Sequence, residues 1–250
     1  MHRFYLPPDE CKTGPLILAG REAHHALRVL RLRQGDRVTV LNGVGGEFIC
    51  EVETYDRDKL QLRIVEQKTF PAPPCQITLL QALPKGKIIE SIIQKATELG
   101  AARIVPLLTE RVVTDVDEKH ADRKAGKWQQ VAIEAIKQCG MPWLPRVEAP
   151  RTVPEFLGGS ECFEMRLVAA LQPGAQHPRT YFKRFELEHG RKPRSVCVWV
   201  GPEGDFTPDE VSAVLASGAL PITLGKLVLR VETAATYCLS IINYEIQSPD

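Results

Sequence analysis

The sequence predicts an α/β protein in which a small β-barrel domain precedes a larger α/β domain. Short segments with strand-like alternation fill the first 70 residues, and a proline-rich stretch at 69–75 follows them. Beyond that stretch, strand-like apolar runs alternate with amphipathic helical patterns to the end of the chain. We therefore expect a β-barrel over 1–70, a linker over 71–75 and an α/β domain over 76–250.

The β-barrel prediction depends on alternation with a two-residue period, which is typical of half-buried strands. Val38 and Val40 are separated by a threonine, and Leu60, Leu62 and Ile64 are separated by polar residues. The larger domain shows a different pattern. Its expected strands are 76–83, 103–108, 166–171, 195–201 and 220–225, and its expected helices are 86–100, 127–140 and 231–246. This alternation favours a mostly parallel sheet, with one poorly patterned connection over 172–194 that holds a short helix.

Composition excludes several classes of protein. The net charge is only +1 for 250 residues, so a nucleic-acid site has to be a local patch. The seven cysteines never form C-x-x-C, which disfavours zinc or disulfides and suits a reducing compartment. No apolar run reaches the ~18 residues of a membrane span, and no signal-peptide pattern opens the chain. We expect a cytoplasmic protein with no metal and no membrane partner.

The first candidate site is the basic segment 21–37, which holds five arginines and two histidines against two acids. On a helix, His24, Arg28 and Arg31 share one face, and this cationic stripe suits a phosphate backbone. A solvated amphipathic helix explains the same pattern. A second cationic site is Lys85 beside Gly86 at a strand-to-helix junction, where either RNA contact or ordinary solvation accounts for the lysine.

The third candidate site is the turn 201–206, within "VCVWVGPEGDFTPDEV". Thr207 and Glu210 form a capping-box pattern for the helix that follows. Glu203 and Asp205 have no such explanation, and acids at a strand end repel a phosphate ligand. Glycines there let the backbone approach a flat ring, so the turn favours a cationic or neutral ligand. The phosphate-loop patterns are absent, which opposes a nucleotide-phosphate enzyme.

The fourth candidate site is "LGKLVLRVETAATYCL", where a second glycine turn follows a strand. Arg230 lies between Leu229 and Val231, and a charge in an apolar run needs a partner. Either an ion pair with a neighbouring acid or a functional role explains it. Glu232 near a helix start is conventional.

Together the motifs resemble one family. "LLQALPKGKIIESIIQKATELG", "VWVGPEGDFTPDEV" and "LGKLVLRVETAA" are similar to the RsmE family of ribosomal RNA uridine N3-methyltransferases, in the SPOUT (trefoil-knotted) superfamily. The N-terminal "HHALRVLRLRQGDRVTVLNG" resembles the PUA-like RNA-binding domain of that family. The resemblance spans nearly the whole chain and keeps the order of four motifs.

The resemblance implies a C-terminal trefoil knot, S-adenosylmethionine bound in it, a homodimer, and 16S rRNA of the assembled small ribosomal subunit as substrate. The implied cofactor contacts are Leu171, Gly201, Pro202, Glu203, Gly204, Leu224, Gly225, Leu229, Arg230, Thr233 and Ala234. The implied RNA contacts are Arg28, Arg31 and Lys85.

For catalysis, we expect Arg230 to stabilise the charge that develops on the uracil. Glu203 or Glu232 is the candidate base, and the alternative role for either acid is only to hold Arg230. The sequence departs from the family at Lys137 and Met141, where Glu and Arg are common. Because of that departure, one alternative function is a non-catalytic RNA-binding assembly factor. Another alternative is a SPOUT methyltransferase with a different base or position specificity.

Overall fold

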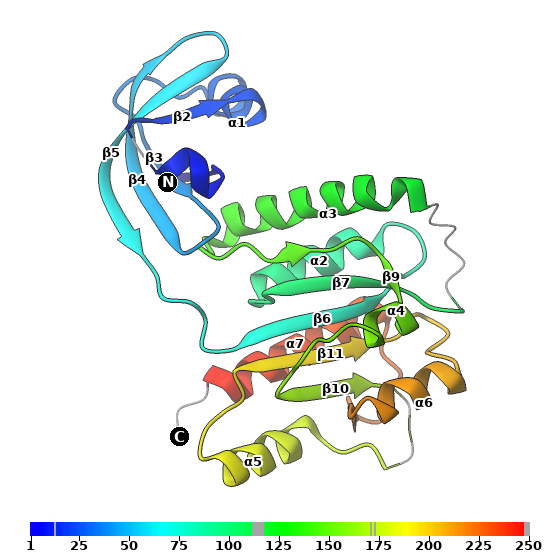
Figure 1. Ribbon diagram of the computed structural model, residues 1–250. Helices are drawn as coiled ribbons and strands as arrows, with labels where there is room; N and C mark the ends of the chain where they lie inside the picture. The colour runs from blue at the N-terminus through cyan, green and yellow to red at the C-terminus, as the bar shows by residue number, and fades with distance from the viewer. Residues whose placement is uncertain (13, 112–117, 171, 173, 248–250) are drawn as a thin grey trace. The chain divides into compact units, whose positions relative to one another are not determined.

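A computed structural model describes residues 1–12, 14–111, 118–170, 172 and 174–247 (Figure 1). The chain divides into two compact units, each with its own core. The N-terminal unit comprises Met1–Ala72 together with Ile133–Leu144, and the second comprises Pro73–Ala132 together with Pro145–Asp250. The segment Ile133–Leu144 therefore packs with residues far from it in sequence, which no pattern in the sequence predicts.

The N-terminal unit is built on a five-stranded sheet with the order β1-β3-β4-β5-β2. The strands are β1 His2–Tyr5, β2 Leu16–Ala19, β3 Arg37–Leu41, β4 Gly46–Tyr55 and β5 Lys59–Thr69. β1 and β3 pair in parallel, and the other neighbours pair antiparallel. Leu60 and Leu62 are fully buried while their neighbours are more exposed, so the predicted half-buried strand is confirmed there. In β3, Thr39 is buried like Val38 and Val40, so the predicted alternation is wrong for that strand.

The helical part of this unit differs from the sequence prediction. A short 3₁₀ turn covers Pro8–Cys11, and α1 covers only Gly20–His24 before a π-helical segment continues over His25–Val29. Arg31 lies beyond the helix with a φ of 55°, in the left-handed region. The prediction that His24, Arg28 and Arg31 share a helical face is therefore wrong. Left-handed backbone cannot continue a right-handed helix, so the chain turns at Arg31.

A buried ion pair ties the end of α3 (Glu118–Cys139) to α1 within the N-terminal unit. The ammonium of Lys137 lies 2.8 Å from the Glu22 carboxylate and 3.1 Å from that of Glu134, and the Lys137 side chain is 6% exposed. The Arg3 guanidinium donates to the carbonyl oxygens of Lys137 and Gln138 at the helix end. The lysine that departs from the family pattern is therefore a structural residue here.

The second unit is built on a parallel sheet with the order β12-β10-β11-β6-β7-β8, and β9 also pairs with β7. The strands are β6 Gln76–Ala82, β7 Arg103–Leu108, β8 Arg146–Val147, β9 Arg151–Thr152, β10 Met165–Ala169, β11 Ser195–Val200 and β12 Leu220–Ile222. Every strand pair of this second sheet is parallel among the described residues, which confirms the predicted α/β class. The strand runs are mostly apolar because helices cover both faces of the sheet.

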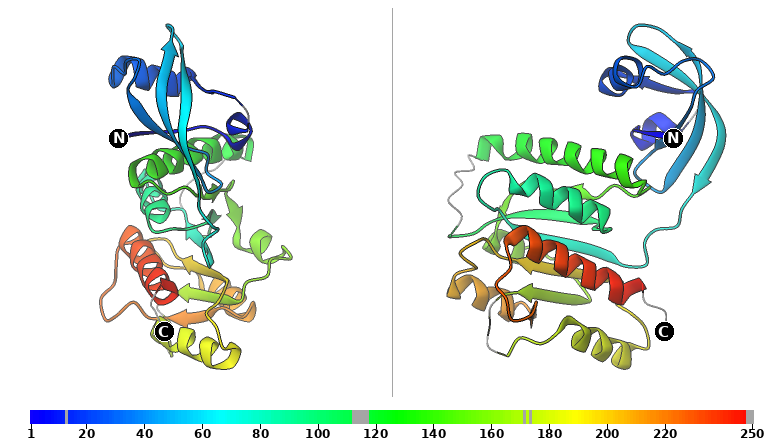
Figure 2. Two further views of the ribbon diagram at one scale, coloured as in Figure 1. Left: turned by 90° about the vertical axis from the view of Figure 1, so that its left-hand side faces the viewer. Right: turned by 180° about the vertical axis from the view of Figure 1, so that it is seen from behind.

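Helices α2 (Ile88–Glu98) and α7 (Val231–Gln247) lie side by side on one face of this sheet (Figures 1 and 2). Helices α4 (Val153–Leu157) and α6 (Pro208–Ala216) pack on the other face, against a core that includes Trp199. The connection over 172–194 holds α5 (Pro178–His189), a longer helix than its weak pattern indicates. Because the strands are parallel, the carboxyl ends of β6, β10, β11 and β12 meet at one edge, where ligands of open α/β sheets bind.

We predict that Lys137→Ala lowers the free energy of unfolding by about 3 kcal/mol, because it leaves the Glu22 carboxylate buried without its cation. Urea denaturation of the whole chain measures the loss. Arg21→Ala is the matched control, since Arg21 pairs with the same Glu134 at an exposed site and costs about 0.5 kcal/mol. Equal losses for the two variants contradict this account of Lys137.

Candidate active site

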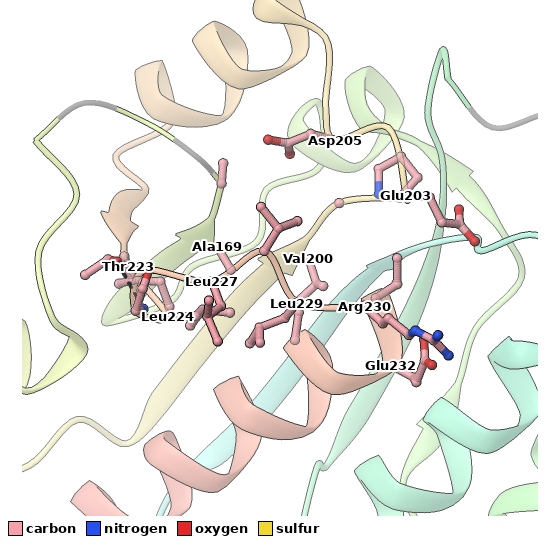
Figure 3. Close-up of a pocket in the computed structure, with 18 of the residues that line it drawn as sticks. Ala169, Val200, Glu203, Asp205, Thr223, Leu224, Leu227, Leu229, Arg230 and Glu232 are labelled. Carbon is pink, nitrogen blue, oxygen red and sulfur yellow. Dashed lines mark hydrogen bonds between the residues drawn. The ribbon is translucent and has the colours of Figure 1, made fainter.

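A pocket of about 800 Å³ opens at the carboxyl edge of the parallel sheet (Figure 3). Its walls come from three chain segments, which follow β10, β11 and β12, and from Ile88 at the start of α2. Its volume falls within the range of small-molecule sites. The strand order places β10 between β12 and β11, so three segments far apart in sequence converge on one cavity.

Most of the predicted cofactor contacts line this pocket. They are Gly201, Pro202, Glu203, Leu224, Gly225, Leu229, Arg230 and Ala234. Gly204 and Thr233 are not among the lining residues, and Leu171 lies outside the residues that the structure describes. The segment that the resemblance implies for the pocket, Leu224 to Ala234, also contains Leu227 and Val228, which line it and are 77% and 81% exposed but were not named individually. Their position in an apolar run after a glycine turn was the available signal.

Two other loops hold the acidic turn in place through hydrogen bonds. The Glu203 carboxylate accepts a hydrogen bond from the backbone N–H of Lys85, at 3.0 Å, which joins the loop before α2 to the turn after β11. The Arg111 guanidinium donates to the carbonyl oxygen of Gly204. Asp205 has a φ of 60°, and its carboxylate accepts from the N–H of Phe206. Glu203 thus has a structural partner, which sequence reasoning did not predict.

Glu210 fixes the helix that follows the turn. Its carboxylate accepts from the Thr207 N–H at 2.9 Å, and the Thr207 hydroxyl accepts from the Glu210 N–H, so the predicted capping box is confirmed. The other carboxylate oxygen accepts from the N–H of Glu110 at 3.0 Å, at the end of the β7 region. Glu210 is 8% exposed, and this second, part-buried contact ties α6 to the loop after β7.

Arg230 and Glu232 lie close together where the last pocket segment enters α7 (Figure 3). Arg230 is exposed at the pocket wall, and among the residues that the structure describes its guanidinium has no ion-pair partner. The ion pair with a neighbouring acid, which the sequence left open, does not form within that part of the chain. The Glu232 carboxylate likewise has no hydrogen-bond or ion-pair partner among the described residues, and it also lines the pocket.

The chemistry of the walls fits S-adenosylmethionine. Apolar residues at the strand ends, such as Ala169 and Val200, offer surface for a flat base, and the glycine turn admits close approach. The acids Glu203, Asp205 and Glu232 suit a sulfonium cation and ribose hydroxyls rather than phosphates.

Four of the seven cysteines are buried. Burial raises the pKa of Cys50, Cys75, Cys197 and Cys238 to about 12, so these thiols stay protonated. No group of three or more His, Cys, Asp or Glu residues there is placed to hold a metal ion. A search of the same residues finds no helix that is both long and apolar enough to span a bilayer.

The predicted RNA contacts lie at two places. Arg28 and Arg31 both line a hollow in the N-terminal unit, although no common helix carries them. His24 is exposed but does not line it. Lys85 is exposed on the loop between β6 and α2, where its backbone contacts Glu203.

The fold and the pocket define the class of the protein as an RNA methyltransferase. A family model described as an RNA methyltransferase domain matches residues 71–243, and one described as an RNA methyltransferase PUA domain matches residues 18–65. Ribosomal RNA small subunit methyltransferase E of Synechocystis is 35% identical over 99% of this chain and 78% of its own length. The Bacillus subtilis relative of the same name is 31% identical over 99% and 98%. The chain therefore belongs to the ribosomal RNA small subunit methyltransferase E family, as its motifs predicted.

Solved structures agree with this assignment. A Legionella pneumophila chain, solved in complex with the bound cofactor SAM, has a TM-score of 0.84 and 31% identity, over 96% of both chains. A ribosomal RNA small subunit methyltransferase E from Neisseria gonorrhoeae, bound to S-adenosyl methionine, has a TM-score of 0.83 and 26% identity. That comparison covers 98% of this chain and 97% of the other.

We predict that Gly201→Ala raises the Kd for S-adenosylmethionine about tenfold, because a Cβ there meets Asp205 Oδ1 at 2.9 Å and displaces the turn. Gly204→Ala is the matched control. A Cβ at Gly204 makes only ordinary contact, 3.4 Å from the Arg111 side chain, and changes the Kd less than about twofold. Isothermal titration calorimetry measures both, and equal affinities for the two variants contradict the assignment of this turn.

Proposed function

We propose that the protein transfers the methyl group of S-adenosylmethionine to N3 of a specific uridine in 16S rRNA, acting on the assembled small ribosomal subunit. The observation that carries the proposal is the pocket of about 800 Å³ that the three motif segments form together. Membership of the small-subunit methyltransferase E family supports the substrate. The ribosomal substrate places the reaction in the cytoplasm.

The reaction requires in-line attack by uracil N3 on the cofactor methyl group and loss of the N3 proton. When bound, S-adenosylmethionine supplies an activated methyl group and its own leaving group. The chain's residues therefore orient the two reactants, exclude water and manage one proton. Because N3 lies on the Watson–Crick edge, the target base has to be unpaired or flipped out of a helix.

Arg230 is the residue best placed to stabilise the uracil anion. Its guanidinium is exposed at the pocket wall and unpaired among the described residues, so it is free to donate to a uracil carbonyl oxygen. A cation there lowers the cost of removing the N3 proton.

Glu232 is favoured over Glu203 as the proton acceptor. Glu203 already accepts the Lys85 N–H, which makes it a positioning residue for the loop that carries Lys85. Glu232 follows Arg230 by two residues, and in the described part of the chain its carboxylate accepts no hydrogen bond from another residue. Arg230 and Glu232 thus supply a cationic hydrogen-bond donor and a base at one corner of the pocket.

A homodimer is part of the proposal. Tyr237 and Tyr244 are 42% and 66% exposed on α7, and Leu227 and Val228 are exposed on the loop before it. A second copy of the chain that covers these side chains removes their apolar surface from water.

The trefoil knot also remains a proposal that follows from the family. The departure at Lys137 does not favour the non-catalytic alternative, since Lys137 serves the buried ion pair described above.

The function is tested by nucleoside analysis of 16S rRNA from a strain that lacks the gene, followed by adding the purified protein and S-adenosylmethionine to its isolated small subunits. We expect 3-methyluridine to be absent before addition and present afterwards. A different methylated nucleoside contradicts the base assignment, and no methylation with cofactor binding intact contradicts the function.

We predict that Arg230→Ala lowers the single-turnover rate of methyl transfer on the order of 10²-fold, because it removes a donor to the developing charge. The Kd for S-adenosylmethionine changes far less, since the apolar walls remain. Lys226→Ala, an exposed cation outside the pocket lining, is the control and keeps the wild-type rate. Rapid-quench measurements that find full rate for Arg230→Ala remove it from catalysis.

We predict that Glu232→Gln and Glu203→Gln have different effects on the rate of methyl transfer. Glu232→Gln lowers the single-turnover rate on the order of 10²-fold, and raising the pH restores part of it because hydroxide removes the N3 proton. Glu203→Gln keeps a carbonyl acceptor for the Lys85 N–H and therefore loses much less. A larger loss at Glu203 than at Glu232 reverses the two assignments.

A further inference from the structure

The N-terminal unit contains a hollow of about 640 Å³ that the proposed reaction does not use. Two segments form it: the end of the helical region, residues 27–33, and the turn between β4 and β5, residues 55–57. The lining residues are Leu27, Arg28, Arg31, Leu32, Arg33, Tyr55, Asp56 and Arg57. The basic motif of the sequence supplies only the first segment, so the second is a finding of the structure.

The hollow concentrates positive charge in a nearly neutral chain. Four arginines and one aspartate line it, so the net charge of the lining residues is +3, whereas the net charge of the whole chain is +1. Among the described residues, none of the four guanidinium groups has an ion-pair partner. Four exposed, unpaired arginines around one hollow form a site for an anion with several charges.

The carboxylates nearest the hollow are engaged in closing the two turns. Asp56 accepts from the backbone N–H groups of Asp58 and Lys59, both at 2.9 Å, and these bonds lower its pKa. Asp36 accepts from the Arg33 N–H at 2.7 Å. Both segments are therefore held in shape without using any arginine side chain, which leaves the arginines available to a ligand.

The remaining lining residues favour a flat ring as part of that ligand. Tyr55 ends β4 and is 44% exposed, with no aromatic partner among the described residues. Leu27 is half-buried and Leu32 is buried, so apolar side chains line the hollow together with the tyrosine ring. A tyrosine beside arginines is the arrangement on which single-stranded nucleic acids stack their bases.

We propose that this hollow binds an unpaired nucleotide of the RNA substrate, with its base stacked on Tyr55 and its flanking phosphates held by Arg28, Arg31, Arg33 and Arg57. This inference rests on the proposed function and names a contact that lies outside the cofactor pocket. A duplex needs only the arginines, because its bases are stacked on each other. An acidic peptide needs no exposed aromatic ring.

The test compares binding of the full chain to two labelled RNA probes, an unstructured oligonucleotide and a perfect duplex of the same length. Tyr55→Ala weakens binding to the single strand about tenfold and to the duplex less than about twofold. Tyr55→Phe keeps the wild-type affinity for both, since the ring remains.

The arginines are tested through salt dependence. Arg33→Gln and Arg57→Gln each reduce the slope of log affinity against log salt by roughly 0.7 for the single strand. Arg63→Gln is the matched control, because Arg63 is an exposed arginine of the same unit that is already paired with Glu51, and it leaves the slope unchanged. A slope unchanged in Arg33→Gln and Arg57→Gln, or a Tyr55→Ala variant that binds both probes like the wild type, overturns the inference.

Failure of this inference is distinguishable from failure of the proposed function. Wild-type methylation of isolated small subunits together with unaltered RNA binding by Tyr55→Ala overturns only the stacking site. A Tyr55→Ala loss that is equal for both probes also overturns it, since it indicates a general change in the unit. Wild-type protein that binds both probes and transfers no methyl group overturns the proposed function instead.

Discussion

The parallel order of β10, β11 and β6 is the constraint on which the active site depends. Parallel neighbours bring their carboxyl ends to one edge, so the loops that leave those ends have to share a small region of space. There the loop backbones lack sheet partners and need other hydrogen bonds. Two acids after β11 meet that need: Glu203 in the turn accepts from Lys85, and Glu210 in α6 accepts from Glu110. The acids of this region therefore have a structural role as well as a chemical one.

This arrangement links two functions that the sequence presents as separate motifs. The Lys85 loop is a predicted RNA contact, and the turn that holds its backbone is a wall of the cofactor pocket. The hydrogen bond between Lys85 and Glu203 connects the two loops directly. A carboxylate that serves this contact is poorly suited to act as the base, which is why Glu232 takes that role in the proposal.

The sequence predicted those features that depend on local patterns. The alternation around Leu60 and Leu62, the capping box of Thr207 and Glu210, and the apolar parallel strands all follow from short-range rules. The features that it did not predict depend on contacts between distant segments. The left-handed backbone at Arg31 and the packing of Ile133–Leu144 with the N-terminal unit are set by tertiary packing, which no local period encodes. Tyr55 and Arg57 join the basic motif only because the turn after β4 lies beside it in the fold.

A crystal structure of the protein with S-adenosylmethionine tests the central claim most directly. The account predicts cofactor density bounded by the segments after β10, β11 and β12, with the Glu203 carboxylate still accepting the Lys85 N–H and Arg230 facing the methyl group. Density at another edge of the sheet contradicts the site. A Glu203 side chain that leaves Lys85 to bind the cofactor contradicts the structural role assigned to it.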